Sequence, residues 1–241
     1  MNIAIIFAGG VGQRFGSSIP KQFLKVHGKP IIIHTLEKFQ YNDNIDLIYV
    51  ACKEDLIPEL SEMIYKYRIT KIPPKGVVPG GKTGQDSIYN ALVAASKDNP
   101  SDSIVLIHDG VRPIITDEVI NKNIESVHKY NSAITCTKAY ETPIISSDGI
   151  NIQSIPPRKN VYTAQAPQSF FLEDILKTHE KVRKTNPNYD DIVDSATLMH
   201  KNGYKVHLIE GNRGNIKVTT REDYIDLLAR LSSEDQKQIL N

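Results

Sequence analysis

Residues 3–16 read IAIIFAGGVGQRFG, an apolar run that passes directly into a glycine-rich loop. The run at 3–7 is continuously apolar, as expected for a strand that is buried on both faces of a sheet. Glycines directly after such a strand let backbone N–H groups approach an anion without obstruction by a Cβ atom. The stretch therefore predicts the first strand of an α/β sheet, with an anion-binding loop at its carboxyl end.

Strand-length apolar runs and helix-length amphipathic stretches alternate along the rest of the chain. This alternation is typical of an α/β fold with a doubly wound, mostly parallel sheet, a Rossmann-like arrangement that binds ligands at the carboxyl ends of its strands. Further strands are predicted at 47–52, 103–108, 133–137 and 206–209, and helices at 31–39, 56–67, 88–95, 119–130, 172–182, 192–199 and 224–231.

The alternation breaks between Lys138 and Arg158. Residues 142–145 (TPII) and 150–152 (INI) flank Ser-Ser-Asp-Gly, and Asp-Gly between β-branched residues is a strong hairpin signal. A hairpin inserted in an α/β domain packs as an extra sheet edge or projects as an arm, and we favour the projecting β-hairpin arm. Because there are no internal repeats or low-complexity linkers, residues 1–241 are predicted to form a single domain that carries 138–158 as the arm.

The composition bounds the functions that this chain can have. Its 241 residues are 40% hydrophobic, which is ample for a core, and 29 basic against 28 acidic side chains leave a net charge of +1. A protein that coats nucleic acid needs a large excess of basic residues, so no nucleic-acid partner is expected. A small phosphorylated ligand needs only a few well-placed cations, and the charge balance does not exclude it.

Neither a cysteine-based metal site nor a membrane segment is predicted. Cys52 and Cys136 lie in apolar stretches without CxxC or CxH spacing, and we expect buried free thiols in a reducing compartment. No apolar run approaches the ~20 residues of a membrane span, and the first residues lack the basic segment of a signal peptide. We therefore expect a cytoplasmic protein without a membrane partner.

The glycine-rich loop supplies cations as well as backbone amides. Its last three glycines are spaced one residue too wide for the dinucleotide fingerprint GxGxxG, and the second predicted strand ends without the acidic residue that holds a ribose. Arg14 and Lys21 instead add two positive charges. A triphosphate needs such charges, whereas a dinucleotide pyrophosphate can rest on backbone amides, so the loop favours a nucleoside triphosphate.

A second phosphate-binding pattern lies at residues 76–83, GVVPGGKT, which match GxxxxGK[ST]. A loop of this type must leave a buried strand, but Pro73 and Pro74 precede it, and two prolines cannot sit in a central strand. In a P-loop a helix should begin at Lys82, and Gly84 disfavours a helix at this point. We interpret the match as a coincidence and keep a P-loop kinase or NTPase built on Lys82 as an alternative.

Residues 108–113, HDGVRP, directly follow a predicted strand. A carboxylate in this position, here Asp109, is suited to hold Mg²⁺ against phosphates, and Arg112 is placed to orient a neighbouring group. The structural alternative is that Asp109 caps the next helix and pairs with Arg112. Thr116 is the better N-cap for that helix, which we expect to leave Asp109 free for the metal. We interpret His108 as a structural hydrogen-bonding residue.

Late in the chain, residues 211–220 place Lys217 on a predicted short strand, ahead of a helix that opens at Arg221. An exposed lysine by itself is uninformative. Together with Arg14, Lys21 and Asp109, however, Lys217 becomes a fourth group of one predicted phosphate site.

Five segments of the chain resemble, in this order, the cytidylyltransferases that act on polyol phosphates. They are residues 8–16 with 20–22, 80–81 with 86–87, 108–113, 165–170 and 215–220. The resemblance spans nearly the whole chain and implies a nucleotidyltransferase fold with CTP and an alditol phosphate as substrates. The insertion at 138–158 resembles the family's dimerisation arm, which implies a homodimer in which the arm completes the neighbouring subunit's site.

The resemblance also implies the reaction. An oxygen of the acceptor's phosphate attacks the α-phosphorus of CTP in line, a CDP-alditol forms, and Mg-pyrophosphate leaves. Since the attacking phosphate is already ionised, catalysis rests on positioning two anions and neutralising their charge, without a general base.

By position in the matching segments, the resemblance assigns residues to three roles and places Mg²⁺ at Asp109. The catalytic cations are Arg14, Lys21 and Lys217. The residues around CTP are Ala8, Gly9, Gly10, Gly12, Gly16, Gly81, Asp86, Ser87 and Gly110. The residues around the acceptor are Asp109, Arg112, Gln165, Asp194 and Lys217, with Thr142 and Arg158 of the arm reaching across the dimer.

Two positions depart from the family pattern. Gly84 stands where relatives often carry Arg, and Ala166 stands before Pro-Gln where the enzymes of 2-C-methyl-D-erythritol 4-phosphate usually have Thr. Both departures concern the acceptor pocket, and the segments at 162–170 and 216–220 are closer to the pentitol branch. We therefore favour a pentitol phosphate such as ribitol 5-phosphate, used in teichoic acid or capsule synthesis, over the methylerythritol phosphate of isoprenoid synthesis. A non-catalytic nucleotide-binding protein of this fold is a further alternative.

Overall fold

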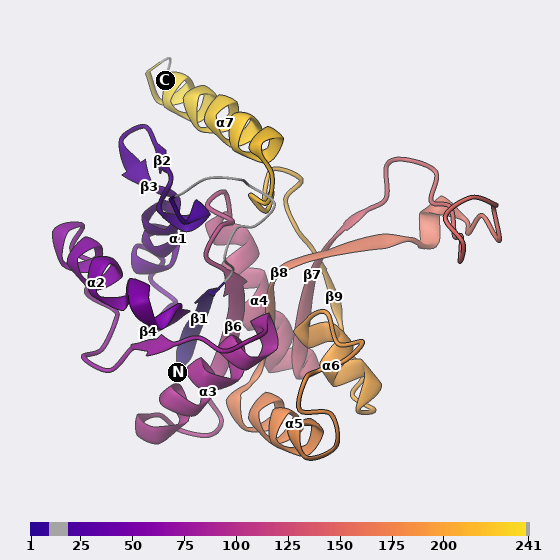
Figure 1. Cartoon of the computed structure of the whole chain (residues 1–241), viewed down its shortest axis with the longest axis horizontal. Helices are drawn as coiled ribbons and strands as arrows, with labels where there is room; N and C mark the ends of the chain where they lie inside the picture. Colours follow the sequence, from indigo (N-terminus) through magenta and orange to yellow (C-terminus); the bar gives the residue numbers. More distant parts are fainter. Residues whose placement is uncertain (10–18, 240–241) are drawn as a thin grey trace.

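Seven strands form one sheet in the order β5-β4-β1-β6-β8-β7-β9 (Figure 1). This computed structural model of the chain describes residues 1–9 and 19–239, with side chains as far as residue 232. Most neighbouring strands pair in parallel, whereas β8 runs antiparallel to both β6 and β7. The predicted α/β fold with a mostly parallel sheet is confirmed. The strands are β1 (Asn2–Ala8), β4 (Leu47–Cys52), β5 (Val77–Pro79), β6 (Ile104–Asp109), β7 (Ser132–Lys138), β8 (Tyr162–Phe171) and β9 (Leu208–Glu210).

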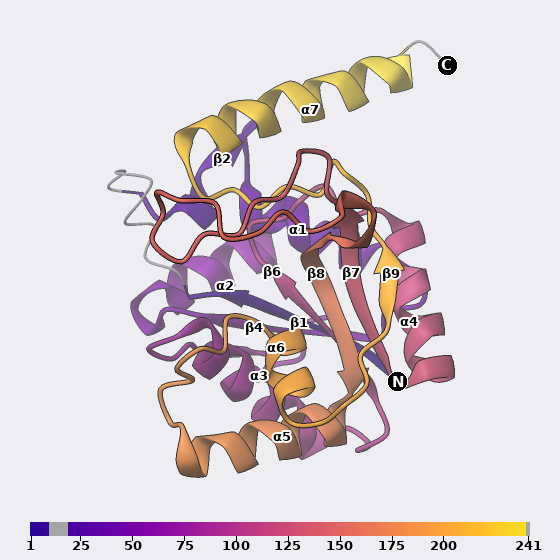
Figure 2. The ribbon, with the colours of Figure 1, turned by 90° about the vertical axis from the view of Figure 1, so that its right-hand side faces the viewer.

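The side chains of β1 point alternately into two hydrophobic layers. Ala4 and Ile6 belong to one layer, and Ile3 and Ile5 belong to the other. This period of two explains why the first apolar run is continuous, since both faces of the strand are covered. The first layer is covered by α1 (Ile31–Gln40), α2 (Ile57–Lys66) and α4 (Asp117–Tyr130), and the second by α3 (Gly84–Asp98), α5 (Leu172–Thr185) and α6 (Ser195–Lys201) (Figure 2).

The central parallel strands end together at one edge of the sheet. Their register pairs Phe7 of β1 with Asp109 of β6, and Ala8 of β1 with Cys52 of β4. The segments that follow these three strands therefore start side by side. In a doubly wound sheet this edge is the place for a ligand.

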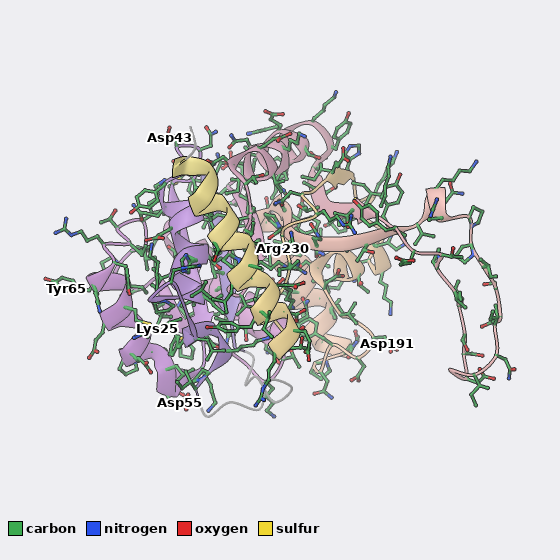
Figure 3. All side chains as sticks on the ribbon, turned by 90° about the horizontal axis from the view of Figure 1, so that it is seen from above. Lys25, Asp43, Asp55, Tyr65, Asp191 and Arg230 are labelled. Carbon is green, nitrogen blue, oxygen red and sulfur yellow. The ribbon has the colours of Figure 1, made fainter. Side chains whose placement is uncertain are left out.

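The C-terminal helix α7 (Arg221–Ile239) crosses the molecule above the other elements (Figure 3). Leu227 of this helix packs in a third apolar cluster with Val111, which follows β6, and with Val218. The cluster also includes Val26 of the small hairpin formed by β2 (Lys25–Val26) and β3 (Lys29–Pro30). By this packing α7 holds the segment around Val218 close to the end of β6.

Residues 139–161 project from the sheet between β7 and β8 (Figure 1). The predicted projecting arm is confirmed, but its predicted hairpin strands do not pair with each other: the bridge in this segment joins Ile145 to Ser154. The carboxylate of Asp148 explains the difference. It accepts hydrogen bonds from the next two backbone N–H groups beyond the Asp-Gly turn, at 2.9 and 2.8 Å, and those donors are no longer available to a partner strand.

Three details of the sheet were missed or wrong in the prediction. β8 was not predicted because Gln165, Pro167 and Gln168 interrupt its apolar pattern, and it forms because β6 and β7 both pair with it. β5 is a three-residue edge strand that follows two prolines. The predicted strand at Lys217 is wrong, because this segment lacks regular pairing.

The predicted helices are found close to their expected positions. Among the described helices, none is both long enough and apolar enough to cross a bilayer.

Candidate active site

Two cavities open at the carboxyl edge of the sheet. The first cavity, of about 490 Å³, is lined by the end of β1, by the short helix η1 (Lys21–Phe23) and by the loop before α3. The second cavity, of about 220 Å³, is lined by the start of α3, by β8 and by the start of α6. Phe7, Gly84, Asp109 and Lys217 line both of them. The site therefore has two compartments that meet at a carboxylate and an ammonium group.

Four lysines from distant parts of the sequence surround the first cavity. They are Lys21, Lys53, Lys82 and Lys217. Lys21 is positioned by its neighbour Gln22, whose Nε2 donates a hydrogen bond of 3.1 Å to the carbonyl of Ala8 and so ties η1 to the end of β1. Four ammonium groups around one cavity suit a ligand with several negative charges, such as a triphosphate.

The loop before α3 is packed closely against the end of β1. The hydroxyl of Ser87 accepts a hydrogen bond from the backbone N–H of Gly81 and donates one to the carbonyl of Thr83, both at 3.0 Å. A Cβ atom on Gly9 would lie 2.8 Å from the Ser87 hydroxyl, and one on Gly81 would lie 2.1 Å from the Cβ of Asp86. Glycine at position 9 therefore lets the end of β1 approach the loop, and glycine at position 81 lets the loop fold against the start of α3.

Asp86 and Ser87, both predicted beside the cytidine, lie behind this loop and do not line either cavity. Asp86 forms a capping box with Thr83 at the start of α3 and an ion pair of 2.5 Å with Arg183 of α5. Partial burial raises the pKa of the Asp86 carboxyl, but the hydrogen bonds from Arg183 and Thr83 outweigh burial, so that the net pKa is lowered. Asp86 is placed to hold the loop in position.

Asp109 stands at the junction of the two cavities and is ion-paired through both of its oxygens. Lys217 Nζ lies 2.6 Å from Oδ1, and Arg112 Nε lies 2.8 Å from Oδ2. Burial raises the pKa of the Asp109 carboxyl, but the positive charges of Lys217 and Arg112 outweigh burial and keep the pKa below its usual range. Thr116 caps α4 as predicted. The expectation that this leaves Asp109 free is wrong, because the two cations neutralise it.

The turn that carries Asp109 and Arg112 is held by buried polar groups. His108 is fully buried, and its Nε2 lies 3.0 Å from the carbonyl of Arg112. Burial lowers the pKa of His108 to about 4, so the ring is neutral near pH 7. Arg112 also donates from its Nη1 to the carbonyl of Asn215 at 2.8 Å, which brings the segment of Lys217 to the junction. These contacts agree with the structural role predicted for His108.

The second cavity has a different chemical character from the first. Gln165 and Asp194, both predicted around the acceptor, line it together with Arg112 and Lys217. Asp194 caps α6 by accepting from the backbone N–H of Thr197 at 2.8 Å. The rest of the wall is mostly apolar or uncharged and includes Phe7, Gln85, Ile88, Ile107, Ala164, Ala166, Gln168 and Val193. This compartment suits a smaller ligand that has one anionic end and a neutral body.

The remaining predicted residues are not at the two cavities or are not described. Gly110 packs against β1, with its N–H bonded to the carbonyl of Phe7 at 3.0 Å, and lines neither cavity. Thr142 and Arg158 lie on the arm; both are exposed, and Arg158 donates to the carbonyl of Tyr140 at 3.0 Å. One chain therefore does not bring them to its own site. Gly10, Gly12, Arg14 and Gly16 fall outside the described residues.

The structure also places unpredicted residues at the site. Lys53 directly follows β4, which pairs with β1, and it lines the first cavity. Its position at the end of a strand could therefore have predicted its place at the site. Lys82 lines the first cavity even though the P-loop interpretation fails. That interpretation fails because β5 lies inside the matching segment and pairs in parallel with β4, so the segment is extended and does not wrap around a phosphate.

Known proteins resemble this chain over almost its whole length. A family model for 2-C-methyl-D-erythritol 4-phosphate cytidylyltransferase matches residues 2–232. A ribitol-5-phosphate cytidylyltransferase of Vibrio parahaemolyticus serotype O3:K6 is 45% identical over 240 residues, which are 99% of each chain. A 2-C-methyl-D-erythritol 4-phosphate cytidylyltransferase of Clostridium botulinum (strain 657 / Type Ba4) is 40% identical over 93% of this chain and 94% of that one. The solved structure of 4-diphosphocytidyl-2C-methyl-D-erythritol synthase from Anaerococcus prevotii superposes with a TM-score of 0.81, at 30% identity and over 96% of each chain.

Proposed function

The chain belongs to the 2-C-methyl-D-erythritol 4-phosphate cytidylyltransferase family and is a nucleotidyltransferase, and we propose that it converts CTP and ribitol 5-phosphate to CDP-ribitol and pyrophosphate. The choice of ribitol 5-phosphate is supported by the relative from V. parahaemolyticus, which is 45% identical over 99% of the chain. 2-C-methyl-D-erythritol 4-phosphate is the second candidate acceptor, because the family model and the relative from C. botulinum carry its name.

The observation that carries this proposal is the meeting of the two cavities at Asp109 and Lys217. The lysine-lined first cavity takes the triphosphate of CTP, and the second cavity takes the alditol phosphate. The acceptor's phosphate then lies at the junction, next to the α-phosphate of CTP. Two substrates held in this way react as if they were one molecule, which removes much of the entropic barrier.

The chemical step needs charge neutralisation more than proton transfer. A phosphate oxygen of the acceptor forms a bond to the α-phosphorus, and the bond from that phosphorus to the oxygen bridging to the β-phosphate breaks. The bonding electron pair leaves on pyrophosphate. Because a phosphate monoester is largely dianionic at neutral pH, no base has to activate it. Lys217 at the junction and Lys21 beside the triphosphate supply the positive charge that the crowded phosphorus requires.

A divalent cation, Mg²⁺, is part of the proposal. Each oxygen of Asp109 accepts from one cationic side chain and has a further lone pair, so the carboxylate can act as one ligand of a hard cation. Within the described ranges no three His, Cys, Asp or Glu side chains form a metal cluster, and Mg²⁺ commonly combines one carboxylate with substrate phosphates and water. When bound there, the ion would offset negative charge on the phosphates.

We extend the proposal to a homodimer built through the arm. The arm exposes apolar side chains, among them Ile144, Ile150 and Ile152, which are 56, 85 and 60% exposed. Exposed apolar residues gathered on one segment are typical of an interaction surface. In such a dimer Arg158 of the neighbouring subunit would bring a guanidinium group to the acceptor's phosphate, and CDP-ribitol would serve teichoic acid or capsule synthesis.

The test is pyrophosphate release by the purified protein with CTP and Mg²⁺ over a panel of alditol phosphates. We expect the highest kcat/KM with ribitol 5-phosphate, and lower values when ATP, GTP or UTP replaces CTP. A higher kcat/KM with 2-C-methyl-D-erythritol 4-phosphate would favour the second candidate. No pyrophosphate with any acceptor would refute the proposed reaction.

A further inference from the structure

Gln85 is a buried polar residue in the second cavity that has no role in the mechanism above. It lies in the first turn of α3, directly after Gly84, and is 4% exposed. Its place is set by the capping box between Thr83 and Asp86, which fixes the start of this helix. The side chain of Gln85 therefore has a defined position on the cavity wall.

The amide oxygen of Gln85 is not satisfied by the described residues. Its oxygen Oε1 is covered and has no hydrogen-bond partner among the described residues. The oxygen Oε1 of Gln165, on the wall of the same cavity, also lacks a partner in the part of the chain that the structure describes. Buried polar atoms without partners are unfavourable and rare, and two of them in residues of one cavity wall mark that wall as a candidate for hydrogen bonds to a ligand.

The other polar groups on this wall are already engaged. Gln168 donates to Asp194 Oδ2 at 2.8 Å and accepts from the backbone N–H of Ala196 at 2.8 Å. Asp194 also accepts from the side chain and backbone of Thr197. Gln168 and Asp194 thus stabilise the wall, while the amide oxygens of Gln85 and Gln165 are covered and unpaired. A ligand in the cavity reaches either amide once that amide turns about its last side-chain bond.

The chemistry of this part of the cavity identifies the ligand group. Ile88 and Ile107, each 2% exposed, line the cavity with Gln85, and the charged groups of its wall are Asp109, Arg112, Asp194 and Lys217. Gln85 itself is uncharged, and a hydroxyl group can donate to its amide oxygen or accept from its amide nitrogen. A glutamine amide can also turn by half a rotation to present either atom.

We propose that Gln85 is a specificity-determining residue that hydrogen-bonds a hydroxyl group on the carbon chain of the acceptor. This inference rests on the proposed function, because it places the acceptor in the second cavity with its phosphate at Asp109 and Lys217 and its carbon chain toward Gln85. A site that is built to bond a hydroxyl rejects an analogue without that hydroxyl, since its own polar atom is then left unpaired. Gln85 therefore selects a fully hydroxylated chain.

The experiment compares the wild type with Gln85→Met, which keeps the length of the side chain and removes the amide. The substrates are ribitol 5-phosphate and the set of deoxyribitol 5-phosphates that each lack one hydroxyl. For ribitol 5-phosphate we expect kcat/KM to fall about tenfold to a hundredfold in the variant, with the KM for CTP within twofold of the wild type. One deoxy analogue lacks the hydroxyl that Gln85 binds, and the wild type should already use it poorly. For this analogue the substitution should change kcat/KM by less than threefold.

Two further variants keep the test decisive. If the Met variant does not fold, Gln85→Asn replaces it in the test. This variant retracts the amide by one methylene and should weaken the same discrimination. Asn90→Met removes an amide from the same helix outside both cavities and should leave the ratio of kcat/KM between ribitol 5-phosphate and each analogue unchanged. A loss of equal size for all acceptors, or no loss in an active Gln85 variant, would overturn the inference. If the wild type itself is inactive with every acceptor, the proposed function fails instead.

Discussion

Lys217→Met is the sharpest perturbation of the proposed site. Lys217 lines both cavities, and its Nζ lies 2.6 Å from Oδ1 of Asp109. Methionine keeps a long apolar side chain and removes the charge. The substitution therefore takes a cation away from the point where the two phosphates meet, and it leaves the Asp109 carboxylate with Arg112 as its remaining ion-pair partner in the described chain.

Two effects set the expected size of the loss. Removal of one preorganised donor to a transition state lowers kcat about 10²–10³-fold, or about 2.7–4 kcal/mol. The carboxylate of Asp109, whose side chain is 8% exposed, also loses one of the two cations that balance its negative charge, and it then repels the incoming phosphates. Two unit charges 4 Å apart interact by about 1 kcal/mol in water and about 4 kcal/mol near a protein surface, and the 41% exposure of Lys217 favours the lower value. Together the effects predict a fall in kcat/KM of about a thousandfold.

Pyrophosphate release with CTP, Mg²⁺ and ribitol 5-phosphate measures this loss. Lys122→Met is the matched control, because Lys122 forms an ion pair of the same length, 2.6 Å, with Glu118 on the exposed face of α4. Its kcat/KM should equal that of the wild type. A folded Lys217→Met variant with kcat/KM within tenfold of the wild type would refute the assigned role of Lys217.

Three other predictions concern the glycine loop, the arm and the pH dependence of stability. Gly81→Ala should lower the free energy of unfolding by about 1–3 kcal/mol and weaken CTP binding, because the added Cβ would lie 2.1 Å from the Cβ of Asp86; an unchanged Tm would contradict this. Mixing inactive Arg158→Ala and Lys217→Met subunits should restore pyrophosphate release if sites are shared across a dimer, since one mixed site then carries both wild-type residues; no gain over the separate variants would argue against shared sites. Because burial lowers the pKa of His108 to about 4, the folded chain stays neutral there while the unfolded chain takes up a proton, so stability should fall as pH drops from about 6.5 to about 4. Denaturant titrations at several pH values give the slope of the free energy of unfolding against pH. His108→Gln should reduce this slope by about 1.4 kcal/mol per pH unit between pH 4 and 6.5, and an unchanged slope would show that His108 does not contribute.

Much of the site could be predicted from positions along the chain. Asp109 directly follows an apolar strand, and Lys21 follows the first glycine-rich loop, so a parallel sheet brings both to one edge. Lys217 was predicted as the fourth group of the phosphate site, Gln165 and Asp194 were predicted from the resemblance, and all three line the cavities. The roles of all these residues in binding and catalysis stay predictions.

Other features depended on contacts that no local pattern reports. The ion pair of Asp109 with Lys217 forms only when the segment around Asn215 packs against the end of β6, whereas Arg112 lies three residues from Asp109 in the same turn. β8 is a strand because it lies between β6 and β7, in spite of its glutamines and proline. The unpaired amide of Gln85 is a property of the folded cavity, since the same residue in an unfolded chain would be solvated.

The α/β fold, the order of most strands and helices, the projecting arm and the family could all be predicted before any coordinates were known. The sequence allowed this because these features follow from short-range periodicity, from turn residues and from motifs in a fixed order. The folded chain was needed to show that two cavities at the carboxyl edge of the described sheet meet at Asp109 and Lys217, and that Asp86 supports the site from behind. Cavities, ion pairs and unsatisfied polar atoms arise between residues far apart in the chain, so they are set by packing and not by spacing.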